Sequence, residues 1–210
     1  CRDVANYNAN VSKEQRFDGV HLDIEPHQRL ARWYQNDDIL SYYKQIFIGC
    51  RNHLIEYEKK YQHTMTLAAD IGTDWWYYAS KLNSFFNDHM QGNVKTIDYV
   101  AVMNYFNDEE TYFTGVSNIQ QIKDWYYNGS TPIAGSDNNI EHYTLPMMFG
   151  METMQTVPNV IPEWMTFYEK GTHELNQLIN KIQNRYANNS QAKGVAIHYY
   201  DTYKALIDSE

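Results

Sequence analysis

Ionisable side chains alternate with aliphatic ones in a strand-like segment near the start of the chain, residues 17–25. The ionisable groups at every second position are His21, Asp23 and Glu25. Because successive side chains of a strand point to opposite faces, these three groups are expected to share one face. An edge strand with one hydrated face would show the same pattern, but parallel strands are buried on both faces, where ionisable groups are costly. The pattern therefore predicts a functional site at the end of this strand.

Four later segments repeat this design, with small or apolar residues first and a functional side chain at the C-terminal end. The segments are residues 63–71, 98–105, 143–152 and 194–200. Their terminal groups are Asp70, Tyr105, Glu152, His198 and Tyr200. Helical patterns at residues 4–14, 37–61, 75–90, 117–127 and 172–186 lie before and between these strands. Strand–helix alternation predicts an α/β fold with a parallel sheet, and a (β/α)₈ TIM barrel collects its active-site groups at the C-terminal ends of its strands.

The first strand carries a family resemblance. Its sequence DGVHLDIE resembles the DGxDxDxE strand-four motif of family 18 glycoside hydrolases, the chitinase-like barrels. Met103-Asn104-Tyr105 is similar to the M-x-Y of their sixth strand. The resemblance implies an incomplete TIM barrel. This chain, as a single domain over residues 1–210, would hold strands four to eight, and the rest of the natural chain would supply the missing N-terminal segment.

The chain departs from the family pattern at two functional positions. His21 stands where the motif has its second Asp, and His198 stands where the eighth strand carries a tryptophan. The chain also resembles an uncharacterised group of bacterial barrel proteins with FDGxHLDxEP, GxET and GxAIHxY blocks, which implies no established activity. A third resemblance is to retaining glycosidases with paired glutamates at strands four and seven, here Glu25 and Glu152.

The resemblances to family 18 and to the paired-glutamate glycosidases imply a glycosidase that acts on a polysaccharide or glycan. Glu25 would be the general acid, and Asp23 would orient a substrate N-acetyl group to which Tyr105 donates a hydrogen bond. Glu152 decides between mechanisms: a carboxyl separation from Glu25 of about 5–5.5 Å favours retention, and about 6.5–9.5 Å favours inversion. If Glu152 turns away, assistance by the substrate N-acetyl group is favoured. Each carboxylate also has a structural interpretation, as a partner of a basic or backbone group.

A second set of residues is expected to bind the substrate. Its members are His21, Asp70, Trp75, His198 and Tyr200. Aromatic rings with a polar group suit stacking on sugars, although they also fill cores. Two alternatives stay open: a carbohydrate-binding barrel without catalysis, and a metal-dependent hydrolase that uses His21 and His198 with carboxylates. No metal and no cofactor is expected in the favoured interpretation.

Charge and composition exclude several classes of partner. The chain has 17 Lys and Arg against 26 Asp and Glu, a formal charge of −9, and it lacks the basic stripe that nucleic acids and anionic membranes require. It has no apolar run of the length that spans a membrane. The two cysteines, Cys1 and Cys50, form no CxxC motif, and a disulfide between them stays open. The compartment is also open, and a secreted or cell-envelope location is compatible with the chain.

Overall fold

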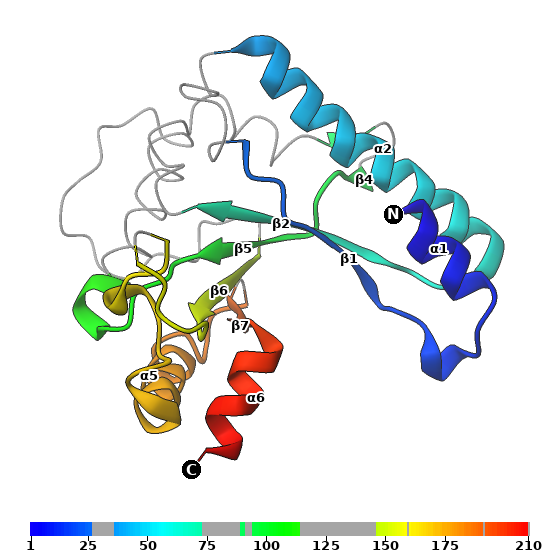
Figure 1. Cartoon of the computed structure of the whole chain (residues 1–210). Coiled ribbons are helices and arrows are strands. Elements are labelled where there is room, and N and C mark those ends of the chain that lie inside the picture. Colours follow the sequence, from blue (N-terminus) through cyan, green and yellow to red (C-terminus); the bar gives the residue numbers. More distant parts are fainter. Residues whose placement is uncertain are drawn as a thin grey trace. The chain divides into compact units, whose positions relative to one another are not determined.

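The computed structural model describes residues 1–26, 36–72, 89–90, 94–113, 146–158, 160–190 and 192–209 (Figure 1). Five parallel strands form one sheet in the order β1–β2–β5–β6–β7, so sequence order and spatial order agree. These strands are β1 Gly19–Leu22, β2 Thr66–Gly72, β5 Tyr99–Met103, β6 Met147–Glu152 and β7 Ala192–His198. The predicted α/β class with a parallel sheet is confirmed, and the sheet of the described strands is not closed.

Helices precede, separate and follow these strands. Within the described residues, the α-helices are α1 Arg2–Ala9, α2 Asp37–Tyr61, α5 Gly171–Arg185 and α6 Tyr200–Asp208. The same residues also form two short 3₁₀ helices, η1 Lys13–Gln15 and η6 Glu163–Met165, and an antiparallel pair of strands, β3 His89–Met90 and β4 Val94–Lys95. The chain forms two compact units: an N-terminal unit of residues 1–71 and 78–100, and a C-terminal unit of residues 72–77 and 101–210.

Helix α2 is the longest element of the N-terminal unit, and local signals set both of its ends. The side chain of Asn36 accepts hydrogen bonds from the backbone N–H groups of Asp38 and Ile39, which an N-cap residue is suited to do. Gln62 ends the helix in the left-handed conformation. The buried face of α2 comprises Tyr43, Phe47, Cys50, Arg51, Leu54 and Tyr57. Asp37 and Asp38 occupy the first turn, where negative charge is favourable.

A disulfide joins the start of helix α1 to helix α2. Helix α1 packs against α2 (Figure 1), and Cys1 forms a disulfide with Cys50 across a Cα–Cα distance of 5.3 Å. The pairing that the sequence left open is therefore present. The chain between the two cysteines includes β1, so the cross-link closes a covalent loop around the first strand.

Strands β1 and β2 approach each other closely at their starts. Gly19 pairs with Thr66, and a Cβ atom at Gly19 would lie 2.6 Å from the carbonyl oxygen of Thr66. Val20 then pairs with Leu67, and His21 with Ala68. Glycine at this position lets the two backbones meet at that spacing. The predicted strand over 17–25 is shorter in the structure, because regular pairing ends at Leu22.

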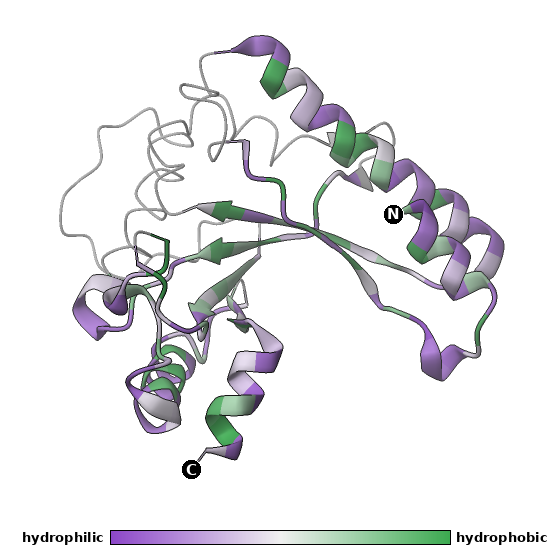
Figure 2. Cartoon of the chain, viewed as in Figure 1, coloured by the Kyte–Doolittle hydropathy of each residue, from purple (hydrophilic) through white to green (hydrophobic). Residues whose placement is uncertain are grey.

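The C-terminal unit is built on the pairing of β6 with β7. Glu152, the last residue of β6, lies opposite His198, the last residue of β7. Helix α5 buries Leu175, Leu178 and Ile182, and β6 buries Phe149, whose ring stacks on Tyr186 at a centroid distance of 5.0 Å. Figure 2 shows that β6 is largely hydrophobic. The core of this unit therefore lies along β6.

Several predicted elements differ in their bounds. The first helix ends at Ala9 rather than at residue 14, because a separate 3₁₀ turn follows it. Residues 89–90 form β3 and not the end of a helix. The last strand runs from Ala192 to His198, so Tyr200 begins α6 instead of ending a strand. The predicted helix over 117–127 lies outside the described residues, as does most of the one over 75–90.

Candidate functional site

In the N-terminal unit, a histidine–carboxylate pair forms between β1 and β2. Nε2 of His21 lies 3.0 Å from Oδ1 of Asp70, with both side chains partly exposed. The register places Asp70 two residues beyond the partner of His21, toward the carboxyl end of β2. The ring of Tyr99 meets the imidazole edge-on at a centroid distance of 5.9 Å. Two predicted binding residues, His21 and Asp70, are thus brought into direct contact.

Asp23 and Glu25 follow β1 immediately. Asp23 is exposed and Glu25 is half-buried, and both belong to the irregular segment that begins after Leu22. Burial raises the pKa of the Tyr43 hydroxyl, and the charges of Asp70 and Asp23 raise it further. The negative charges of Asp23 and Asp70 therefore act on Tyr43, which lies on the buried face of α2.

The pKa of the Tyr99 hydroxyl is raised for the same reasons as that of Tyr43. Burial raises the pKa of its hydroxyl, and the charges of Asp70 and Asp98 add to this effect. Negative charge therefore gathers at this end of the N-terminal unit while its tyrosines stay neutral. Neutral hydroxyls beside carboxylates provide hydrogen-bond donors, as the recognition of a polar uncharged ligand requires.

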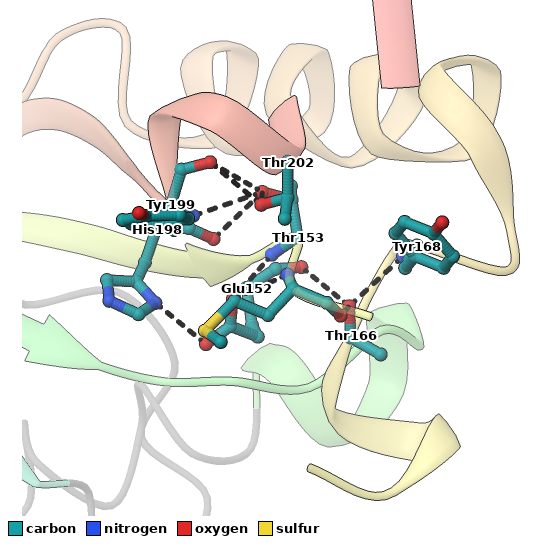
Figure 3. Close-up of polar contacts among 8 residues, drawn as sticks. Glu152, Thr153, Thr166, Tyr168, His198, Tyr199 and Thr202 are labelled. Atoms are coloured by element: carbon teal, nitrogen blue, oxygen red, sulfur yellow. Dashed lines mark hydrogen bonds and ion pairs between the residues drawn. The ribbon is translucent and has the colours of Figure 1, made fainter. Parts of the chain in front are cut away.

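Glu152 is the best-anchored predicted residue in the C-terminal unit. It is 3% exposed, and its oxygens receive three contacts (Figure 3). The backbone N–H groups of Thr153 and Met154 donate to Oε1 at 2.8 and 2.7 Å. Nδ1 of His198 lies 2.8 Å from Oε2. Both oxygens of this carboxylate are therefore engaged within the C-terminal unit, which is the arrangement expected of a positioning group.

The imidazole of His198 is held by a ring stack in addition to the contact of Nδ1 with Glu152. Its side chain is 50% exposed. The ring of Tyr105 stacks on the imidazole at a centroid distance of 6.0 Å and an interplanar angle of 24°. Three predicted site residues, Glu152, His198 and Tyr105, thus form one contiguous group, whereas Tyr200 lies 69% exposed on α6.

Thr153 fixes the backbone that carries His198. Its hydroxyl lies 2.9 Å from the His198 carbonyl oxygen and 3.1 Å from the hydroxyl of Thr202, and it accepts from the backbone N–H of Tyr199 at 3.1 Å (Figure 3). The backbone N–H of Thr153 also donates to the His198 carbonyl at 2.5 Å. On the other side, the Thr166 hydroxyl donates to the Met154 carbonyl at 2.7 Å. Hydrogen bonds of Thr153 with His198, Tyr199 and Thr202 therefore join the end of β6 to the start of α6.

Sequence reasoning missed the residues that support the site. Thr153, Thr166 and Thr202 carry no signal in the sequence that separates them from surface threonines, and Tyr43 and Tyr99 read as core aromatics. The GxET block does place Thr153 beside Glu152, and a short hydroxyl next to a buried acid was an available clue. Trp75, predicted to bind sugar, lies outside the described residues.

The described residues allow a limited range of chemistry. Within these ranges, no three His, Cys, Asp or Glu side chains gather closely enough to hold a metal ion. Each histidine–carboxylate pair suits proton transfer or hydrogen bonding to a hydroxyl group, because imidazole and carboxylate groups are both able to exchange protons near neutral pH and the carboxylate orients the ring. No helix in the described part of the chain is long and apolar enough to cross a membrane.

Comparison of the chain with family models, curated proteins and solved structures gave no match.

Proposed function

We propose that the protein is a glycoside hydrolase in which Glu25 donates a proton to the leaving oxygen and Asp23 orients the substrate. The observation that carries this proposal is the placement of both carboxylates directly after Leu22, at the carboxyl end of a parallel strand. Such ends supply catalytic groups in α/β enzymes. Cleavage of a glycoside requires a proton on the departing oxygen as positive charge develops on the sugar ring.

The neighbouring pair of His21 and Asp70 supports a sugar substrate. A partly exposed imidazole and carboxylate at 3.0 Å present donors and acceptors side by side, and vicinal hydroxyl groups of a sugar match such a pair. Tyr99 adds an aromatic ring against the imidazole. In this proposal His21 and Asp70 bind the substrate, and Trp75, His198 and Tyr200 keep the binding roles that the sequence suggested.

The environment of Glu152 bears on the choice of mechanism. A nucleophilic carboxylate needs an oxygen that can reach the anomeric carbon. Oε1 of Glu152 already accepts two backbone hydrogen bonds, and Oε2 faces His198. In our proposal Glu152 is therefore a positioning residue, and the attacking group is the substrate N-acetyl oxygen or a water molecule. Tyr105 contributes to the site by stacking its ring on the imidazole of His198.

We propose that the parallel sheet belongs to a TIM barrel. The order β1–β2–β5–β6–β7 equals the chain order, as in consecutive strands of a barrel. In our proposal these five strands form part of such a barrel.

A panel of 4-methylumbelliferyl glycosides tests the proposed activity, with N-acetylated and plain sugars side by side. We expect Glu25→Gln to lower kcat by roughly 10²–10⁴-fold, the usual contribution of general acid catalysis. Glu174→Gln is the matched control, because Glu174 is an exposed glutamate on α5. Turnover that survives Glu25→Gln would remove Glu25 from its role. Sugar binding without turnover by the unaltered chain would instead favour the non-catalytic barrel.

A further inference from the structure

The geometry of the C-terminal unit points to a further binding site: we propose that Trp164, with Phe106 behind it, is a platform on which one sugar ring of a polysaccharide stacks. The inference rests on the proposed function for its class of ligand, and it adds a place where such a ligand is held. It concerns the C-terminal unit alone, because both residues belong to that unit.

The first observation is a stacked pair of rings, one of which is open to solvent. Trp164 is 52% exposed. Its ring stacks on that of Phe106 at a centroid distance of 5.5 Å and an interplanar angle of 24°. Single exposed apolar side chains are common on protein surfaces, so exposure alone would carry no argument. The stack adds to it, because it fixes the plane in which the indole is presented.

The second observation is a buried side chain that holds the turn of Trp164. Asn107 is 8% exposed, and its Nδ2 donates to the carbonyl oxygens of Glu163 and Thr166 at 2.5 and 2.7 Å. The backbone N–H of Asn107 donates to the Trp164 carbonyl oxygen at 3.0 Å. Nζ of Lys170 donates to the Asn107 carbonyl oxygen at 2.7 Å. The turn that carries the indole is therefore ordered before a ligand arrives, which lowers the entropic cost of binding.

The third observation is the place of the platform in the fold. Phe106 follows Met103, the last residue of β5, by three positions. Thr166, two residues after Trp164, pairs with Glu152, the last residue of β6 (Figure 3). The platform is thus tied to the carboxyl ends of two strands, the side on which α/β proteins bind their ligands.

A sugar ring fits the platform in size and in charge. The C–H groups of a pyranose form an apolar face that matches the flat indole, while its hydroxyl groups stay in water. A single exposed indole is small against the roughly 800 Å² that each partner buries in a stable protein interface. Nucleobases also stack on tryptophan, but their phosphates would meet the exposed Glu163 beside Trp164 and a chain of formal charge −9. Size and charge together therefore favour an uncharged sugar.

Affinity electrophoresis of the full chain tests the platform, with glycol chitin, hydroxyethyl cellulose or no polysaccharide in the native gel. We expect at least one of the two polysaccharides to retard the unaltered chain, and Trp164→Ala to raise the apparent Kd roughly tenfold. Trp164→Phe should keep part of the binding, because it keeps a flat ring. Val160→Ser is the matched control: Val160 is 67% exposed and lies four residues before Trp164, so this variant removes apolar surface from the same loop and should bind as before.

Equal retardation of Trp164→Ala and the unaltered chain would overturn the proposal, as would an equal loss in Val160→Ser, which would indicate a general apolar surface. Absence of any retardation of the unaltered chain would also overturn it, while turnover of methylumbelliferyl glycosides would still support the proposed function. Retardation that depends on Trp164, without turnover of any glycoside, would support the platform and count against the proposed hydrolase.

Fluorine NMR of the chain labelled with 5-fluorotryptophan provides a readout that does not depend on the stability of Trp164→Ala. Loss of one resonance in Trp164→Phe assigns the signal of Trp164. Titration of the unaltered chain with tetra-N-acetylchitotetraose or cellotetraose, chosen by the polysaccharide that binds, should shift this resonance. A Trp164 resonance that stays in place throughout the titration would overturn the proposal.

Discussion

The buried guanidinium of Arg51 on α2 forms an ion pair with the half-buried carboxylate of Asp98, which lies directly before β5. The same guanidinium donates to the carbonyl oxygens of Thr96 and Met65, both at 3.2 Å. The same carboxylate oxygen of Asp98 accepts the backbone N–H of Leu67 at 2.7 Å. One arginine therefore holds the helix, the start of β2 and the approach to β5 in the N-terminal unit.

We expect Arg51→Ala to destabilise the protein by about 1–3 kcal/mol, because it removes the cation beside the half-buried Asp98 and the donor to the carbonyl oxygens of Thr96 and Met65. Urea unfolding followed by far-ultraviolet circular dichroism measures this change. Arg2→Ala is the control, since Arg2 is exposed and its ion pair with Asp3 lies in solvent. A loss for Arg51→Ala no larger than that of the control would show that backbone contacts alone hold this region.

Gly150 sits where β6 approaches Val102 and Tyr105. A Cβ atom there would lie 2.5 Å from the Val102 carbonyl oxygen and 3.1 Å from the Tyr105 ring. We expect Gly150→Ala to cost on the order of 1–3 kcal/mol through overpacking. Gly49→Ala is the matched control, because Gly49 lies in α2 with open space around its Cα, so alanine should stabilise the helix by roughly 0.5–1 kcal/mol. Equal thermal midpoints for the two variants would contradict this assignment.

Alkaline pH should destabilise the N-terminal unit through Tyr43. Burial, then Asp70 and Asp23, raise the pKa of Tyr43 in the folded chain above its ordinary value. The unfolded chain therefore loses this proton at lower pH than the folded chain does, so stability is complete below about pH 10 and falls as pH rises above it. Unfolding free energies across this range, with tyrosinate absorbance as the monitor, measure the fall. Tyr43→Phe should flatten it, and an unchanged slope in that variant would assign the effect elsewhere.

The pair of His21 and Asp70 should matter for substrate affinity in the proposed glycosidase. Asp70→Asn keeps the shape of the side chain but removes the charge that faces Nε2 of His21. Hydrogen bonds to charged groups are worth about 1.5–3 kcal/mol, so we expect kcat/KM to fall roughly tenfold or more, mainly through KM. Steady-state kinetics with the best glycoside of the panel provides the values. Asp37→Asn, at the exposed start of α2, is the control.

Local signals made much of the fold predictable. The bounds of α2 were predicted as 37–61 and are Asp37–Tyr61, because the signals are local: an amphipathic pattern, acidic residues in the first turn and lysines in the last turn. The cores of all five strands of the parallel sheet were also found. Their exact ends were not, because pairing partners decide where a strand stops: β1 ends at Leu22, where its partner in β2 is Ala69.

The contacts within the candidate site were less accessible from sequence. Glu152 and His198 were both predicted to be functional, but their pairing depends on the register of β6 against β7, which places them opposite each other. The partner of His21 depends in the same way on the register of β1 against β2. Alternation along a strand shows on which face a side chain lies. Which side chain it meets depends on the register between two strands, and these strands are separated by 40 or more residues of chain.

The disulfide between Cys1 and Cys50 has a consequence for handling the protein. A proteolytic nick anywhere in the loop that it closes would leave two peptides still covalently joined. Such a molecule would migrate as an intact chain on a denaturing gel and separate into fragments once a thiol reagent is added. Integrity of the segment that carries His21, Asp23 and Glu25 is therefore judged by reducing electrophoresis alone.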